Sequence, residues 1–265
     1  MPSSRVAVIG AGAAGLVATR ELRREGHAAV VFERAVAVGG TWLYDEAASA
    51  DPLGAGGVHG SLHASLRTNL PHECMGFLDF PFLADEGSSS SDPRRFPGHQ
   101  EIDRAEEDGS VVFQDGSRVK ADAIMHCTGY VPASCTYKYS FLGDDSAITV
   151  DDNRVGPLYK HVFPPRLAPS ISFVGLPFKG ILFPVFQLQN SWVAGVLSGR
   201  IKLSSPDEMM VEVASFYSDM EARGRPKRFT HDLGVSTFEY QDWLVDRCGL
   251  ERIEEWRKAI YVMSQ

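Results

Sequence analysis

Residues 5–15, Arg-Val-Ala-Val-Ile-Gly-Ala-Gly-Ala-Ala-Gly, decide the fold of this chain. The apolar run over residues 5–9 is typical of a buried parallel strand. A glycine-rich turn, Gly10-x-Gly12-x-x-Gly15, follows at once, and a helical pattern then continues to Gly26. Residues 28–32 form a second apolar run, which ends on Glu33. The sequence therefore predicts a βαβ unit with a right-handed crossover and places the chain in the α/β class.

The spacing of these glycines, between a strand and a helix, is a dinucleotide-binding fingerprint. Such glycines permit a tight turn, a close approach of the backbone to a pyrophosphate, and close packing of helix on strand. An acid at the end of the second strand can accept hydrogen bonds from a ribose. The complete context favours a nucleotide site over a turn that binds nothing. The predicted cofactor-binding residues of this unit are Gly10, Ala11, Gly12, Ala13, Ala14, Gly15 and Glu33.

The fingerprint alone does not choose between FAD and a nicotinamide cofactor. Gly39-Gly40-Thr41-Trp42 follows the second strand, and two glycines with an aromatic residue suit a backbone that wraps closely around FAD. We therefore expect Gly40, Thr41 and Trp42 to contact that cofactor. The alternative is an ordinary Gly-Gly turn with a packing tryptophan.

After residue 82 the sequence predicts first a loop, then further strands, and finally helices. Residues 83–110 hold few large apolar side chains, which predicts a loose loop. Beyond it, Asp115-Gly116 lies between two alternating runs and indicates a hairpin. Residues 123–127 and 171–174 are predicted strands. The last third is predicted to be helical, with helices that begin at Ser205 and Ser236 and with one apolar helix stripe that we expect in the core (Met209, Val213, Phe216, Tyr217 and Met220).

Composition and charge narrow the class of protein. Lys plus Arg is 26 and Asp plus Glu is 34, so the net charge is −8, which gives no general attraction to nucleic acid. The four cysteines are scattered, and we expect reduced thiols, a cytoplasmic protein and no transmembrane segment. His59 and His63 lack an obvious third ligand, so no metal site is predicted.

Several motifs together resemble those of the flavin-containing monooxygenases, most closely the plant branch that oxygenates sulfur. The matching stretches run over nearly the whole chain. They are residues 8–16, Phe32-Glu33-Arg34, Gly39-Gly40-Thr41-Trp42, Leu66-Arg67-Thr68-Asn69-Leu70-Pro71, Met75-Gly76-Phe77, Asp79-Phe80-Pro81-Phe82, Phe96-Pro97-Gly98-His99 and Cys127-Thr128-Gly129-Tyr130.

The resemblance implies a Rossmann-like FAD-binding domain, a three-layer fold around a parallel sheet with a hairpin or meander return and a helical C-terminal region. It also implies that NADPH reduces FAD, that reduced flavin and O2 form a C4a-hydroperoxide, and that a small thioether or amine substrate takes the distal oxygen. Asn69 would be the catalytic residue beside the flavin, although a turn residue before Pro71 is the alternative. Further implied cofactor contacts are Thr68, Leu70, Thr128, Gly129 and Gln187. Gln187 and its neighbour Gln189 could instead lie on a solvated helix face.

One departure from the family is large. Full-length members carry a second G-x-G-x-x-G in an inserted NADPH domain, and this sequence has none. A domain of about 150 residues would be missing at Gln100–Glu101. We therefore predict a first half of the FAD domain at residues 1–82, a flexible linker at 83–110, and a second half with C-terminal helices at 111–265. Two alternatives stay open, an impaired FAD-binding fragment and a flavin oxidase that needs no NADPH; a homo-oligomer is compatible with each.

Overall fold

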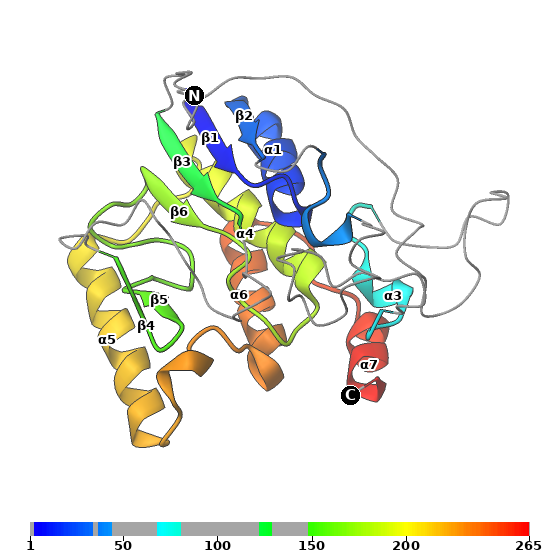
Figure 1. Cartoon of the computed structure of the whole chain (residues 1–265), viewed down its shortest axis with the longest axis vertical. Helices are drawn as coiled ribbons and strands as arrows, with labels where there is room; N and C mark the ends of the chain where they lie inside the picture. The colour runs from blue at the N-terminus through cyan, green and yellow to red at the C-terminus, as the bar shows by residue number, and fades with distance from the viewer. Residues whose placement is uncertain (1–2, 34–36, 44–67, 81–121, 129–147, 265) are drawn as a thin grey trace, which may run out of the picture.

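A parallel sheet of four strands forms the centre of the structure (Figure 1). This computed structural model describes residues 3–33, 37–43, 68–80, 122–128 and 148–264. The strand order is β2–β1–β3–β6, and every neighbouring pair is parallel. The strands are β1 (Arg5–Ile9), β2 (Ala28–Phe32), β3 (Ala123–His126) and β6 (Ile171–Phe173). The predicted α/β class and both strands of the βαβ unit are confirmed.

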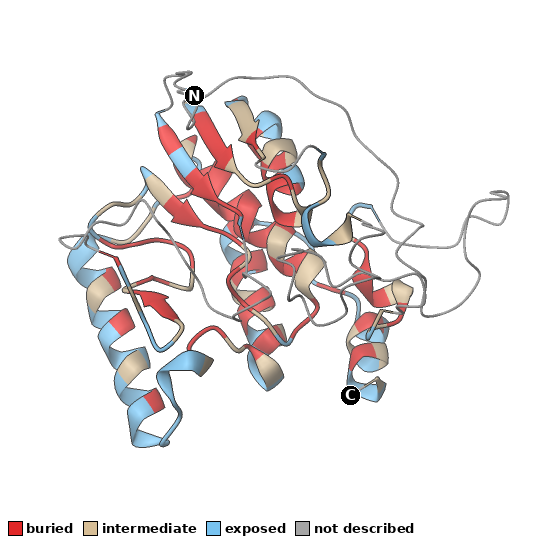
Figure 2. Ribbon diagram, in the orientation of Figure 1, coloured by how far each residue is buried: buried red, intermediate tan, exposed pale blue. Residues whose placement is uncertain are grey.

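Two long helices cover one face of this sheet. Helix α1 (Ala13–Arg24) contacts β1 and β2, and it packs along α4 (Leu182–Leu197), which in turn packs against α6 (Thr237–Cys248). Alternate strand residues share a face, and Val6 and Val8 pair in register with Ala123 and Met125. All four belong to the largest apolar cluster together with residues of α1 and α4. Figure 2 shows this central block as the most buried part of the molecule.

The other face of β6 is covered by a small antiparallel hairpin. It consists of β4 (Thr149–Asp151) and β5 (Arg154–Gly156). Its apolar side chains pack on Ile171 and Phe173, which lie on the face of β6 opposite to Ser172. Helices, sheet and hairpin thus form three layers at β6, as predicted. The hairpin expected at Asp115-Gly116 lies outside the described residues.

The C-terminal third is helical, as predicted. Helix α5 (Pro206–Ala222) begins with a full capping box, because Ser205 and Glu208 satisfy each other's backbone N–H groups. The 3-10 turns η3 (Lys227–Phe229) and η4 (Gly234–Ser236) lead to α6, and α7 (Glu255–Met263) ends the described chain. Two details differ from expectation: Ser236 makes no side-chain cap, and Phe216 of the apolar stripe is 38% exposed.

Helix α7 packs against the short helix α3 (His72–Met75), away from the sheet (Figure 1). Residues 68–80, which include α3, are called segment 68–80 below. The turn η1 (Gly40–Trp42) lies between this segment and α1 in the same view. None of the helices in the described ranges is long and apolar enough to cross a membrane. The predicted linker at residues 83–110 falls outside the described residues.

Candidate functional site

The carboxyl ends of three strands meet at the glycine turn, residues 10–15. The backbone N–H of Gly10 donates to the carbonyl of Phe32 at 2.6 Å, and the N–H of Cys127 donates to the carbonyl of Ile9 at 2.8 Å. These bonds bring the ends of β2 and β3 beside the turn. Glu33, the residue after β2, and Thr128, two residues after β3, therefore lie at one edge of the sheet. Open α/β sheets bind ligands at this edge.

Close packing around the glycine turn leaves no room for a side chain at Gly15 or at Gly40. A Cβ on Gly15 would overlap the carbonyl oxygen of Gly10, and a Cβ on Gly40 would lie 2.8 Å from the Cα of Gly12. The N–H of Gly39 donates to the carbonyl of Ala11 at 2.9 Å. The turn η1 is therefore held directly against the glycine turn, as a backbone that wraps around a nucleotide requires.

Helix α1 presents a bare N-terminus at this turn. Its N-cap is Gly12, which has no side chain to satisfy the first backbone N–H groups, and its first turn holds no acidic residue. Free N–H groups and the helix dipole favour an anion at such a terminus. Together with the excluded Cβ positions, this end of α1 fits a pyrophosphate.

Glu33 lies where the sequence predicts a ribose-binding acid. Its Oε2 accepts a hydrogen bond from the backbone N–H of Ala11 at 2.7 Å. This bond fixes the carboxylate against the glycine turn. A carboxylate can accept several hydrogen bonds, so this contact is compatible with a further bond from a ribose hydroxyl.

Trp42 connects the η1 turn to α4. The centroid of its ring lies 6.0 Å from that of Phe183, and the ring centroid of Phe77 lies 5.3 Å from that of Phe183. Trp42 therefore has a packing role of the kind that the alternative reading expected. Gly40 and Thr41, its neighbours, are exposed.

Segment 68–80 begins with the predicted catalytic motif. The hydroxyl of Thr68 donates to the carbonyl of Leu70 at 2.8 Å and so closes a local turn. Asn69, at the middle of this turn, is exposed, while Leu70 packs on the apolar cluster of Cys74, Ile181 and Tyr261. Asn69 is therefore an exposed turn residue, and its place beside a flavin stays a prediction.

The two glutamines of α4 are buried, so the alternative interpretation, a solvated helix face, is wrong. Gln187 is 4% exposed and Gln189 is fully buried. The N–H of Leu78 donates to Oε1 of Gln187 at 2.7 Å, and Nε2 of Gln187 donates to Asp79 at 2.9 Å. Gln187 therefore binds segment 68–80. Because both ends of its amide are used there, nothing in these contacts indicates the cofactor contact that the resemblance implied.

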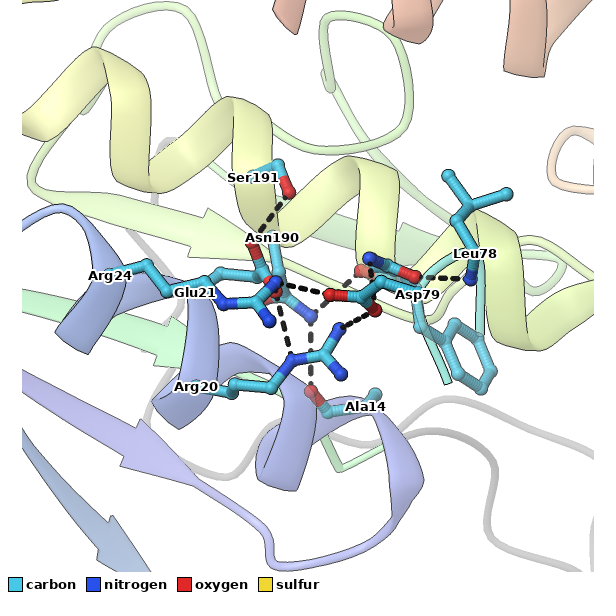
Figure 3. Close-up of polar contacts among 10 residues, drawn as sticks. Ala14, Arg20, Glu21, Arg24, Leu78, Asp79, Asn190 and Ser191 are labelled. Carbon is cyan, nitrogen blue, oxygen red and sulfur yellow. Dashed lines mark hydrogen bonds and ion pairs between the residues drawn. The ribbon is translucent and has the colours of Figure 1, made fainter. Parts of the chain in front are cut away.

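Sequence reasoning missed a charged cluster beside Gln187, called the Asp79 network here (Figure 3). Its members are Arg20, Glu21, Arg24, Asp79, Gln187 and Ser191. The signal was present in the sequence, because Glu21 falls among the apolar positions of α1 and is only 6% exposed. A buried acid needs partners, and three arginines, Arg20, Arg23 and Arg24, lie within one helical turn of it.

Cys127 packs against the glycine turn, and its thiol stays protonated at neutral pH. Its Cβ lies 3.5 Å from the position that a Cβ on Gly15 would take, and burial raises the pKa of the thiol to about 12. Within the ranges that the structure describes, no three His, Cys, Asp or Glu side chains gather to hold a metal ion. Gly129, His59 and His63 lie outside those ranges.

A family model and several known proteins match this chain. The model "Flavin-binding monooxygenase-like" matches residues 3–88 and 99–244. Flavin-containing monooxygenase FMO GS-OX-like 4 of Arabidopsis thaliana is 36% identical over 413 residues, which cover 98% of this chain and 90% of the relative. FMO GS-OX4 of the same plant is 35% identical, with 96% and 87% covered.

A solved structure is similar over the same extent. The S-allyl-L-cysteine S-oxygenase of Allium sativum superposes with a TM-score of 0.81 at 35% identity, covering 99% of this chain and 92% of that one. Tmm from Pelagibacter shares the fold, with a TM-score of 0.64 at 18% identity. The alignment of 413 positions to FMO GS-OX-like 4 is longer than the 265-residue chain, so roughly 150 positions of that relative face gaps here, about the size of one domain.

Proposed function

Because this chain belongs to the flavin-containing monooxygenase family, in its plant GS-OX-like branch, we propose that it binds FAD and serves the oxygenation of soft sulfur or nitrogen nucleophiles. The overall reaction consumes NADPH, a proton and O2, and yields NADP+, water and the oxygenated substrate. One oxygen atom forms the new bond to sulfur or nitrogen, and the other leaves as water. FAD, when bound, supplies the chemistry that accepts a hydride and activates O2.

The glycine turn carries the proposal for FAD. The bare N-terminus of α1 and the excluded Cβ positions of Gly15 and Gly40 support a pyrophosphate there. Glu33, fixed by the N–H of Ala11, would accept hydrogen bonds from the adenosine ribose. We expect the exposed backbone of Gly40 and Thr41 to lie along the same cofactor, with Thr128 at the adjoining strand end.

Asn69 would act at the other end of the cofactor. Its side chain offers two N–H donors and one acceptor, and its exposure leaves it accessible to a flavin ring. Its role would be to hold the reacting groups in position and to help exclude water. The packing of Leu70 and the bond from Thr68 to the carbonyl of Leu70 would keep the asparagine at that place.

The relatives support a thioether as the first substrate class to test. The similar protein of Allium sativum is named an S-allyl-L-cysteine S-oxygenase, and the preferred substrate of this chain would be a small thioether of that kind. A tertiary amine is the second class, since its nitrogen is also a soft nucleophile.

An impaired FAD-binding fragment is the second candidate, and two observations favour it. The sequence contains a single G-x-G-x-x-G, and about 150 positions of a full-length relative face gaps here. A micromolar nicotinamide site represents about 8 kcal/mol of binding free energy, which a missing domain would no longer supply. We therefore expect FAD binding of modest affinity and NADPH-driven turnover near zero for the chain alone.

The absorbance spectrum of the purified chain, before and after anaerobic addition of NADPH, tests both candidates. Flavin bands that bleach with NADPH would establish a working monooxygenase. Bands that persist with NADPH would establish the impaired fragment. Bands that bleach only with an organic substrate would establish an oxidase instead. A purified, folded chain that takes up no FAD would refute the proposal.

A further inference from the structure

Asp79 joins segment 68–80 to both helices that cover the sheet. Its carboxylate lies 3.0 Å from Nη2 of Arg20 and 2.6 Å from Nη1 of Arg24, both on α1. It also accepts a hydrogen bond from Nε2 of Gln187, on α4, at 2.9 Å. Figure 3 shows Arg20 and Arg24 reaching from α1 toward Asp79.

The partners of Asp79 are themselves held in place. Nε of Arg20 and Nη1 of Arg24 each lie 3.0 Å from Oε1 of the buried Glu21, and the hydroxyl of Ser191 donates to Oε2 of Glu21 at 2.9 Å. A network of fixed charges loses less side-chain entropy on forming each contact than an isolated surface pair. The Asp79 network therefore attaches segment 68–80 to α1 through side chains that are themselves bonded to Glu21.

The carboxylate of Asp79 is ionised at neutral pH. Partial burial opposes its charge, but the hydrogen bond from Arg24 and the charges of Arg20 and Arg24 outweigh burial and lower its pKa. The same contacts raise the pKa of Arg24. Charge as well as hydrogen bonding thus holds segment 68–80 to α1.

Segment 68–80 has a second attachment near its middle. Arg257 of α7 donates from Nη1 to the carbonyl of Gly76 at 3.1 Å, and its side chain is 2% exposed. The segment is therefore fixed at Gly76 by α7 and at Leu78–Asp79 by α1 and α4. Asn69 lies at the start of this twice-attached segment, and the glycine turn lies at the start of α1. Helix α1 thus connects the proposed pyrophosphate site to the attachment of the catalytic segment.

We propose that Asp79 is a positioning residue, which holds segment 68–80, and with it Asn69, in a fixed place relative to the glycine turn. The inference rests on the proposed function for the role of Asn69, but the attachment itself is a property of the chain without FAD. Asp79 touches neither the glycine turn nor Asn69 in the contacts above. It would act on the site only through the segment.

The test compares Asp79→Asn with Glu25→Gln in the full chain. Both substitutions remove one carboxylate charge that links α1 to other elements. Glu25 directly follows Arg24 at the end of α1, but it pairs with Arg200 and accepts from Ser198 at 3.0 Å, two residues that lie just beyond α4 and outside segment 68–80. It is therefore a matched control for a general loss of stability.

Hydrogen–deuterium exchange of the chain without FAD gives the first readout. Loss of partly exposed ion pairs worth about 1 kcal/mol corresponds to about fivefold faster exchange. Asp79→Asn should produce this increase in peptides that cover residues 68–80, and Glu25→Gln should not. Unchanged exchange in Asp79→Asn, or an equal increase in Glu25→Gln, would overturn the inference even if the chain bound no FAD.

The visible spectrum of bound FAD gives the second readout. Asn69→Ala should shift the flavin bands, Asp79→Asn should shift them in the same direction, and the double variant should shift them no further than Asn69→Ala. A flavin spectrum that Asn69→Ala alters and Asp79→Asn leaves as in the unmodified chain would refute the positioning role. Failure of the unmodified chain to take up FAD would instead refute the proposed function.

Discussion

A side chain on Gly15 would overlap the carbonyl oxygen of Gly10, whereas a side chain on Gly12 would meet only the Cα of Gly40, at 3.6 Å. The first contact belongs to the fold, because Gly15 packs α1 against the loop that leaves β1. The second position faces the place where the backbone would approach a pyrophosphate. Two glycines of one motif thus have separable roles.

We expect Gly15→Ala to prevent folding and Gly12→Ala to leave the fold intact but weaken FAD binding about 100-fold, which corresponds to about 3 kcal/mol. Circular dichroism measures the first effect, and fluorescence titration with FAD measures the second. A folded Gly15→Ala chain, or a Gly12→Ala chain with unchanged FAD affinity, would contradict this division.

Buried histidines should make the fold sensitive to mild acid. Burial lowers the pKa of His126 to about 4, and it lowers those of His161 and His231 as well. A lowered folded-state pKa means that the unfolded chain binds more protons between pH 6.5 and about 4, so stability falls as the pH falls through that window. The titration of His126 alone should lower the free energy of unfolding by about 2 kcal/mol between pH 6.5 and pH 5.

Urea unfolding at pH 7.5 and pH 5.0 measures this loss, and His126→Gln should make it smaller. The range from pH 7.5 to pH 5.0 separates the effect of the histidines from that of the carboxylates. Asp79 and Glu25 have pKa values below 3.8 and 4.5, so what they contribute to stability is lost only at lower pH. Equal stability at the two pH values would show that these histidines are not kept neutral in the folded chain.

The serines at the N-termini of α5 and α6 should differ in how much they stabilise the fold. The hydroxyl of Ser205 accepts from the N–H of Glu208 at 3.3 Å, whereas Ser236 makes no side-chain cap. Ser205→Ala should therefore lower the free energy of unfolding by about 1 kcal/mol, and Ser236→Ala should leave it nearly unchanged. Urea denaturation of both variants side by side gives the comparison; equal losses would mean that the capping box does not stabilise α5.

Two arginines near the C-terminus should likewise differ in their contribution to stability. Arg257 is buried and bonds to the carbonyl of Gly76, while Arg252 is 60% exposed and pairs with the exposed Asp246. Arg257→Ala should lower the free energy of unfolding by about 2 kcal/mol, because it leaves the buried carbonyl of Gly76 without its donor. Arg252→Ala should cost less than about 0.5 kcal/mol. Thermal unfolding of both variants checks this order, and a larger effect for Arg252→Ala would contradict it.

The sequence predicted structure correctly where the local pattern allows a residue only one structural role. Gly10 to Gly15 and Glu33 were placed correctly because the βαβ pattern leaves them a single geometry at the end of β1 and β2. The capping box at Ser205 was also predictable, since it depends only on residues three apart.

Tertiary contacts decided the positions that were missed. The solvated helix face that was one interpretation of Gln187 is wrong, because its amide bonds to Leu78 and Asp79, over a hundred residues earlier. A hairpin return was predicted, but its position at β4–β5 was not, although Asp152 and Asn153 both adopt positive φ and are residue types that tolerate it. No local pattern reports which distant segment will satisfy a buried amide.

The pairing of β1 with β3 also bears on how this fold can change in evolution. Ile9 and His126 are register partners although they are 117 positions apart in the sequence. The pairing of β1 with β3 does not depend on the length of the chain that connects these two strands. Loop closure becomes only slowly more costly with length. A whole module can therefore be gained or lost between these neighbouring strands while the sheet keeps its register, which makes this junction a natural point for recombination and for grafting a domain from a relative.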